Sequence, residues 1–207
     1  SVYKDLMLLL STSGSTGSPK LVKLSRSNVY SNSDSILGYL PITEEDVCLL
    51  NLPLSYSYGM SILNTHLLSD STIYLSNESF LSKELWSIIS TLKVSSLAGV
   101  PDMIRMLKLM KLEKRLGILE NLKYVTQAGG KLDIGNRVYF HELFTKNSIE
   151  FYIMYGQTEA TARMSFLGPN RFNEKIASVG KPIPGGNFEI NGNEKNIHGY
   201  IEGEIIY

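Results

Sequence analysis

The chain has 207 residues, 43% of them hydrophobic and 19% charged, so it is long enough for one domain with a sizeable core and too apolar to be disordered. Its 20 basic and 20 acidic residues cancel, which argues against a surface that binds nucleic acid or an anionic membrane. Apolar runs are far shorter than the roughly 18 residues of a membrane span. Cys48 is the only cysteine, which excludes an intrachain disulfide and favours a core thiol in a reducing, cytoplasmic compartment.

The first predicted elements are two short strands that flank a polar loop. Residues 6–10 form an apolar run typical of a buried strand, and residues 21–24 resume a strand pattern. The ten residues between them carry several hydroxyl side chains, two glycines and Lys20. Such a segment has no apolar side chain to bury, but it offers backbone N–H groups, hydroxyl donors and one cation. These groups can wrap a polyphosphate.

The loop has two other interpretations. By composition it is a Ser/Gly linker, although a linker rarely sits between two strand-like runs. It also fails the Walker pattern, because only two residues separate Gly14 from Gly17 and Pro19 precedes the lysine. An ordinary nucleotide kinase or GTPase is therefore disfavoured.

Beyond the loop, helical and strand patterns alternate as far as about residue 154. Caps at Ser25 to Asn28 open a helix that Gly38 closes. Further helices are predicted at 60–68, 80–92, 101–110 and 133–144, and strands at 47–52, 71–75, 94–98, 122–126 and 149–154. Short strands follow at 164–167, 187–190 and 204–207. The pattern predicts an α/β fold: a layered, mostly parallel sheet flanked by helices, with short β segments toward the C-terminus.

A second polar signal follows the predicted strand at 149–154. Tyr155 and Gly156 lead into Thr158 and Glu159, at the strand end that faces the ligand crevice of an α/β sheet. Glu159 could hold Mg²⁺, Thr158 could bond an α-phosphate, and Tyr155 could lie against a purine ring. The alternative is a plain helix start with a buried tyrosine.

These motifs together resemble the adenylate-forming, AMP-binding superfamily, which includes acyl-CoA synthetases, nonribosomal peptide synthetase adenylation domains and beetle luciferases. Residues 12–20 resemble its phosphate loop, and Tyr-Gly-x-Thr-Glu at 155–159 is its second signature. Its aromatic segment, glycine turn, Gly-x-Pro-x-Pro-Gly turn and Gly-Glu-Leu strand have counterparts at 53–59, 128–132, 180–185 and 203–205.

The resemblance implies a reaction and its residues. A small carboxylic acid and ATP, with Mg²⁺, form an acyl-adenylate and pyrophosphate, and the acyl group then passes to a thiol of coenzyme A or pantetheine. The implied catalytic residues are Lys20, Thr158 and Glu159, the last as the metal ligand. The implied nucleotide-binding residues are Thr12, Ser13, Gly14, Ser15, Thr16, Gly17, Lys20, Gly130, Met154, Tyr155, Gly156 and Thr158. The implied substrate-binding residues are Tyr56, Ser57, Tyr58, Gly129 and Gly130.

Two positions depart from the family pattern. Ile153 stands where the family often has an Asn or Gln that reaches the adenine amine. Ser57 stands where amino-acid-activating members usually place an Asp that pairs with the substrate ammonium. Because an unpaired buried ammonium is costly, we expect the substrate to be a carboxylic acid without an amino group.

We expect residues 1–207 to be a partial AMP-binding domain, with the N-terminal part and the mobile C-terminal lid outside the chain. On that expectation this piece alone does not turn over. Two alternatives stay open: an adenylation domain that loads an acyl-carrier protein, and a non-catalytic nucleotide-binding relative. His66, His141 and His198 lack metal-ligand spacing and are interpreted as structural or surface residues.

Overall fold

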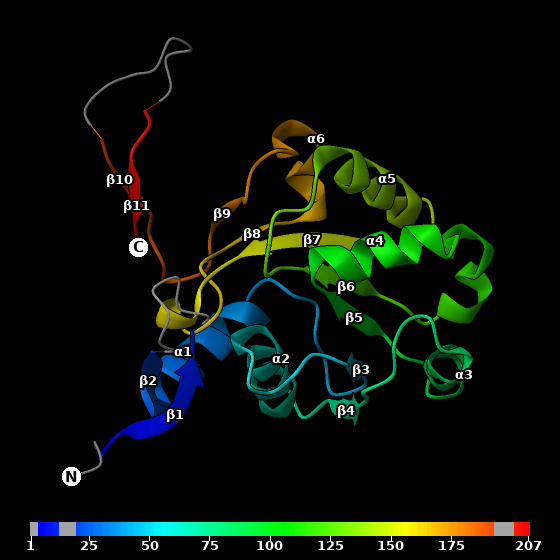
Figure 1. The fold of residues 1–207 in the computed structure, drawn as a ribbon, viewed down its shortest axis with the longest axis horizontal. Coiled ribbons are helices and arrows are strands. Elements are labelled where there is room, and N and C mark those ends of the chain that lie inside the picture. The colour runs from blue at the N-terminus through cyan, green and yellow to red at the C-terminus, as the bar shows by residue number, and fades with distance from the viewer. Residues whose placement is uncertain (1–3, 13–19, 193–200) are drawn as a thin grey trace.

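A computed structural model describes residues 4–12, 20–192 and 201–207. Its centre is a seven-stranded sheet in the order β4-β3-β5-β6-β7-β8-β9 (Figure 1). The strands from β4 to β7 run parallel, whereas β8 and β9 add in antiparallel pairing. The predicted α/β class with a mostly parallel sheet is therefore confirmed.

The elements follow one another in the predicted alternation. The sheet strands are β3 (Val47–Leu50), β4 (Thr72–Leu75), β5 (Ser96–Gly99), β6 (Tyr124–Gln127), β7 (Glu150–Tyr155), β8 (Ser165–Leu167) and β9 (Lys181–Pro182). The helices are α1 (Arg26–Leu37), α2 (Ser57–Leu68), α3 (Lys83–Thr91), α4 (Pro101–Leu109), α5 (Ile134–Thr145) and α6 (Phe172–Lys175). Short 3₁₀ turns are η1 (Leu112–Lys114), η2 (Leu116–Leu119), η3 (Thr158–Ala160) and η4 (Pro169–Arg171). The pattern did not predict these turns, α6 or β9.

Alternation along the strands builds two cores, one on each face of the sheet. In β7, Phe151 and Ile153 face a cluster that also contains apolar side chains of α3, α4, α5 and α6. Tyr152 and Met154 face the opposite cluster, to which α1 and α2 contribute. Successive strand residues point to opposite faces, so a continuous apolar run supplies both layers at once. The sheet is thereby buried between two helical layers.

The polar loop lies in a separate two-stranded hairpin, β1 (Leu6–Ser11) with β2 (Leu21–Ser25). The Thr12 N–H donates to the Lys20 carbonyl at 3.0 Å, so the two described ends of the loop are side by side. The prediction of a fully buried first strand is wrong: of its apolar residues only Leu10 is buried, whereas Met7 and Leu9 are exposed. One face of a two-stranded ribbon lacks a covering layer among the described residues, which explains the alternation. A second ribbon, β10 (Glu189–Asn191) with β11 (Glu204–Ile206), projects from the layered body (Figure 1).

Several single-residue predictions can be compared with the structure. Cys48 is a buried core thiol, and burial raises its pKa to about 12. His66 and His141 are buried structural residues, and His198 lies outside the described residues. Among the described residues, no helix is long and apolar enough to cross a membrane.

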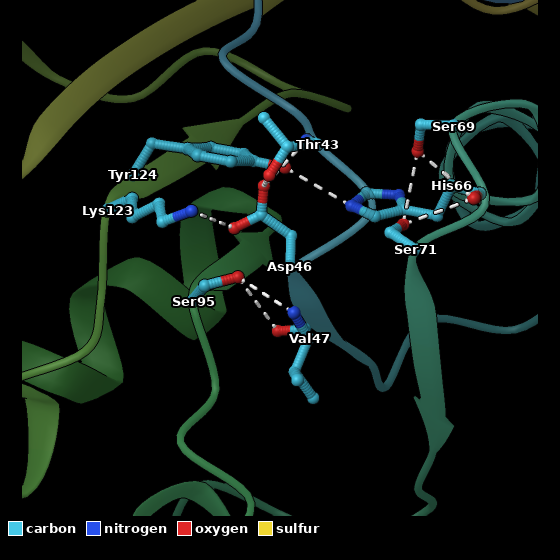
Figure 2. A network of polar contacts seen from close by, with 9 residues as sticks. All are labelled: Thr43, Asp46, Val47, His66, Ser69, Ser71, Ser95, Lys123 and Tyr124. Carbon is cyan, nitrogen blue, oxygen red and sulfur yellow. Dashed lines mark hydrogen bonds and ion pairs between the residues drawn. The ribbon is translucent and has the colours of Figure 1, made fainter.

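The amino ends of the parallel strands carry a polar network around the buried Asp46 and His66 (Figure 2). Asp46, just before β3, is fully buried, and its carboxylate lies 2.8 Å from the Lys123 ammonium that precedes β6. The other carboxylate oxygen accepts from the Thr43 N–H at 2.7 Å. Beside them, His66 contacts the Ile62 carbonyl and the Tyr124 hydroxyl through its two ring nitrogens. The network joins β3, β6 and the end of α2 at the amino ends of the strands.

The Asp46 carboxylate should make the stability of the fold depend on pH. Burial alone would raise its pKa, but the polar contacts from Lys123, Ser95 and Thr43 outweigh burial and lower it. A lowered pKa in the folded state means a stabilisation that is present above the ordinary aspartate pKa of about 3.9 and lost as the pH falls through the folded-state value. We expect Asp46→Asn to reduce the free energy of unfolding by about 1.5–3 kcal/mol at pH 7, and by progressively less below about pH 4.

Urea unfolding at a series of pH values measures this difference. The matched control is Asp102→Asn, since Asp102 pairs with Arg105 on the exposed surface of α4 and such pairs contribute little. Equal losses for the two variants at pH 7, or a loss for Asp46→Asn that does not shrink in acid, would contradict the assignment.

Candidate active site

A cleft of about 720 Å³ opens at the carboxyl ends of the central strands. Four segments that are distant in the sequence form its walls: the end of β1, the 53–58 segment, the turn after β6, and the turn after β7. The lining residues are Ser11, Thr12, Pro53, Ser55, Tyr56, Ser57, Tyr58, Ala128, Gly129, Gly156, Gln157, Thr158, Glu159, Ala162 and Arg163. In an open parallel sheet, this edge is where ligands bind.

The aromatic segment places the start of α2 at the cleft. The helix begins at Ser57, earlier than the predicted residue 60, and among the described residues the N-cap Tyr56 makes no side-chain capping bond. The N–H groups of the first turn therefore carry the positive end of the helix dipole without a described capping side chain. A Cβ on Gly129 would clash with the Tyr56 hydroxyl. Gly129 also has a φ of +77°, a backbone conformation that residues with a side chain rarely adopt, so glycine is needed at this position.

The turn after β7 folds back on itself. A Cβ on Gly156 would overlap the Ala162 carbonyl, and the Ala162 N–H in turn donates to the Gln157 carbonyl at 3.2 Å. Thr161 and Ala162 have φ values of 59° and 90°, which is costly for residues other than glycine. This compact turn presents Thr158 and Glu159 to the cleft.

One hydrogen bond joins two of the predicted motifs directly. The Thr158 hydroxyl donates to the Ser57 hydroxyl at 3.2 Å, across 101 positions of sequence. Thr158 is thereby positioned against the first turn of α2. Tyr58 lies deeper, where its hydroxyl is 2.8 Å from that of Thr126, and burial raises its pKa to about 12.

Arg163 is a wall residue that the sequence patterns did not indicate. It is 2% exposed, and its guanidinium carbon lies 4.1 Å from the centre of the Tyr58 ring. The one signal in the sequence is that Arg163 stands between Ala162 and Met164, just before β8. An arginine between apolar residues can be buried, and a buried arginine usually has a partner.

A second cleft of about 560 Å³ adjoins the first. Residues of α1, the 157–161 turn and the 183–186 segment line it, and Glu159 lines both clefts. The carboxylate is exposed and stands at the boundary between the two spaces. A group bound at this boundary can touch ligands on both sides.

The structure brings together most, but not all, of the predicted site residues that it describes. Those lining the cleft are Thr12, Tyr56, Ser57, Tyr58, Gly129, Gly156, Thr158 and Glu159. Lys20 is exposed and joins the cleft only through the bond of its carbonyl to Thr12, and Gly130, Met154 and Tyr155 do not line it either. Met154 is buried, with its sulfur accepting from the Tyr39 hydroxyl. Ser13, Gly14, Ser15, Thr16 and Gly17 lie outside the described residues.

Ile153, the first departure from the family pattern, points away from the cleft. It is 2% exposed and belongs to the core on the α5 side of the sheet. Its side chain therefore contributes no polar group to the cleft.

The oxygen donors at the cleft edge suit one hard cation. Glu159 supplies a carboxylate and Thr158 a hydroxyl next to it, and Mg²⁺ is typically held by one or two carboxylates together with phosphate oxygens and water. The described residues contain no group of three or more potential metal-ligating His, Cys, Asp or Glu side chains.

Comparison with known proteins gives a family match over nearly the whole chain. A model for AMP-binding enzymes matches residues 3–207. The chain is 29% identical over 198 residues to a 2-succinylbenzoate–CoA ligase of Bacillus subtilis, an alignment that covers 96% of this chain and 39% of that ligase.

Two solved structures of the Bacillus subtilis o-succinylbenzoate CoA synthetase are also similar. One holds an acyl-adenylate intermediate, with a TM-score of 0.78, 28% identity, and coverage of 95% of this chain and 39% of that chain. The other holds ATP and a magnesium ion, with a TM-score of 0.77, 26% identity, and coverage of 95% and 40%. The chain thus spans about 40% of the length of these relatives.

Proposed function

The chain belongs to the AMP-binding enzyme family, and on this premise we propose that the protein containing it activates a small carboxylic acid with ATP. The products of the first step are an acyl-adenylate and pyrophosphate. The observation that carries the proposal is the meeting of Thr12, Ser57, Thr158 and Glu159 around one cleft, although the sequence separates them widely. The protein is proposed to continue beyond residues 1–207, since the chain spans 39% of the similar ligase.

The reaction needs no nucleophile from the enzyme. A carboxylate oxygen of the acid bonds to the α-phosphorus of ATP, and the bond from that phosphorus to its bridging oxygen breaks, which releases pyrophosphate. The protein must hold two anions together and stabilise the charge of the transition state. The uncapped first turn of α2 is suited to the carboxylate, because its N–H groups and dipole favour an anion.

The phosphate side is proposed to use the loop at 11–20 and the turn after β7. Thr12 stands at the described start of the loop, and Lys20 at its end can reach the phosphates only by turning its exposed side chain inward. When the nucleotide binds, the Thr158 hydroxyl turns its one proton from Ser57 to the α-phosphate, and Glu159 holds Mg²⁺. When bound, Mg²⁺ neutralises phosphate charge. The proposed nucleotide site further includes residues 13–17, Gly130, Met154, Tyr155 and Gly156, and the acid is proposed to contact Tyr56, Tyr58 and Gly129.

Coenzyme A is the proposed acceptor in the second step. The similar Bacillus subtilis protein is a CoA ligase, which supports this choice over a carrier-protein pantetheine. We also propose a cytoplasmic location, because Cys48 is a buried free thiol of the kind that reducing compartments preserve.

ATP–pyrophosphate exchange by the full-length protein across a panel of carboxylic acids tests the proposal. Acid-dependent exchange is expected, and the second step then appears as loss of coenzyme A thiol. ATP binding without exchange for any acid would favour the alternative of a non-catalytic relative. Residues 1–207 alone are expected to give no turnover.

The absence of a carboxylate at Ser57 gives a sharper expectation. A substrate ammonium placed beside the first turn of α2 would meet N–H groups and a hydroxyl, with no described carboxylate lining the cleft except Glu159. We expect the full-length protein to activate a deamino acid at least 10-fold faster than the matching α-amino acid, as kcat/KM in the exchange assay. Faster exchange with the amino acid would refute this.

A further inference from the structure

Arg163 is a buried cation that pairs with no carboxylate among the described residues. The described ion pairs are those of Arg105, Lys123 and Arg171, and Arg163 is in none of them. Its Nε is buried without a hydrogen-bond partner, although the side chain is 2% exposed. Removing a charge from water is costly unless an opposite charge or acceptors replace the lost hydration.

The neighbours of Arg163 satisfy it only in part. The guanidinium lies over the Tyr58 ring, a cation–π contact that is worth less than an ion pair with good geometry. The guanidinium also lies near the Tyr39 hydroxyl. Burial raises the pKa of Tyr39 to about 12, although the charge of Arg163 acts in the opposite direction. Both phenols therefore remain neutral at physiological pH, and the positive charge is not cancelled.

Arg163 lies between the cleft and a smaller cavity. Arg163 borders the 720 Å³ cleft and also a cavity of about 20 Å³ enclosed by α1, α2 and the sheet. Thr158 and Glu159 border the cleft but not this inner cavity. A molecule whose reacting carboxylate lies at Thr158 can place its far end at Arg163, because both residues line the same cleft.

The inner cavity is unsuited to a hydrocarbon tail. It has room for about one water molecule. Its walls are mostly apolar, but they also include Arg163 and the Ser96 Oγ, which is buried without a partner. An alkyl chain here would need a larger space and would leave the Arg163 cation without a polar partner.

We propose that Arg163 is a specificity-determining residue that selects a short acid with a second anionic group, such as a dicarboxylate, by pairing with the group distal to the reacting carboxylate. The inference rests on the proposed function and names its substrate class. A distal carboxylate supplies the missing counter-charge, and a guanidinium binds a carboxylate through charge-assisted hydrogen bonds.

Matched acids test this with the full-length protein. Succinate, glutarate and adipate are each compared with the corresponding monoamide, which keeps the length and removes the distal charge. For the best of the three we expect kcat/KM in ATP–pyrophosphate exchange to exceed that of its monoamide by about 10- to 100-fold. Arg163→Gln should reduce this ratio to near one, and Arg163→Lys should retain part of it.

Arg115→Gln is the control variant, because Arg115 also lies over an aromatic ring, that of Trp86, but does not border the cleft. It should leave the ratio unchanged. A wild-type preference for the monoamide, or a preference that survives Arg163→Gln, would overturn the inference while leaving acid activation intact.

A binding readout separates the two proposals. The dicarboxylate should raise the melting temperature of the wild type more than its monoamide does. This difference should vanish in Arg163→Gln and be smaller than in the wild type in Arg163→Lys. If no acid supports exchange, the proposed function fails, while the melting data still decide whether Arg163 binds the distal group. Equal shifts for the dicarboxylate and the monoamide would count against the Arg163 site.

Discussion

Replacing Glu159 with glutamine is expected to slow acyl-adenylate formation about 100- to 1000-fold, the loss typical of removing one group that stabilises transition-state charge. The carboxylate stands at the boundary of two clefts, where no other described carboxylate lines either space. Glutamine keeps the shape of the side chain but is a much poorer ligand for Mg²⁺. The measurement is ATP–pyrophosphate exchange by the full-length protein at several magnesium concentrations.

The result should be specific to this carboxylate. Glu174→Gln is the matched control, since Glu174 pairs with Arg171 at an exposed site outside both clefts, and it should retain full activity. For Glu159→Gln, the magnesium concentration that gives half-maximal rate should also rise. A variant with normal exchange and unchanged magnesium dependence would remove Glu159 from the proposed metal site.

Adding a single methyl group at Gly156 is expected to destabilise the protein by about 3 kcal/mol, at the upper end of what overpacking costs. The new Cβ would overlap the Ala162 carbonyl and approach the Arg163 Cα at 2.9 Å, and both neighbours are backbone that cannot rotate away. The turn that presents Thr158 and Glu159 must then open. We therefore expect Gly156→Ala to lose adenylation activity together with stability, as measured by exchange and by urea unfolding.

The same substitution at an unhindered glycine separates crowding from a general effect of replacing glycine. A Cβ on Gly117, within η2, has no atom within 4 Å, so Gly117→Ala should be neutral or slightly stabilising and fully active. A Gly156→Ala variant as stable and active as Gly117→Ala would show that the 156–162 turn is not as tight as described.

Much of the fold could be predicted because it depends on local patterns. The alternation of strands and helices from residue 47 to residue 155 follows from apolar periodicity, and the Pro101 start of α4 follows from the restricted φ of proline. Burial of β1 could not be predicted, because a run of apolar residues does not say which layers will cover it. The short β9 strand has too few residues for any periodicity.

The site was predictable only where residues form a continuous motif. Thr158 and Glu159 lie in the cleft as expected, because a turn after a parallel strand reaches the ligand edge of the sheet. The Thr158–Ser57 hydrogen bond and the burial of Arg163 depend on packing between distant segments, which a sequence pattern does not encode. For Lys20 the motif predicts which residue belongs to the site, but it does not predict the rotamer of a long, exposed side chain.

The Asp46–Lys123 ion pair and the cleft residues lie at opposite ends of the central strands. The ion pair between the buried Asp46 and the exposed Lys123 joins the amino ends of two strands, whereas the cleft residues lie at the carboxyl ends. Mutational drift at the mouth of the cleft can therefore change which acid is accepted while the anchoring charge pair stays untouched. Outside the tight 156–162 turn, ligand preference can therefore change without loss of the ion pair that anchors the opposite ends of the strands.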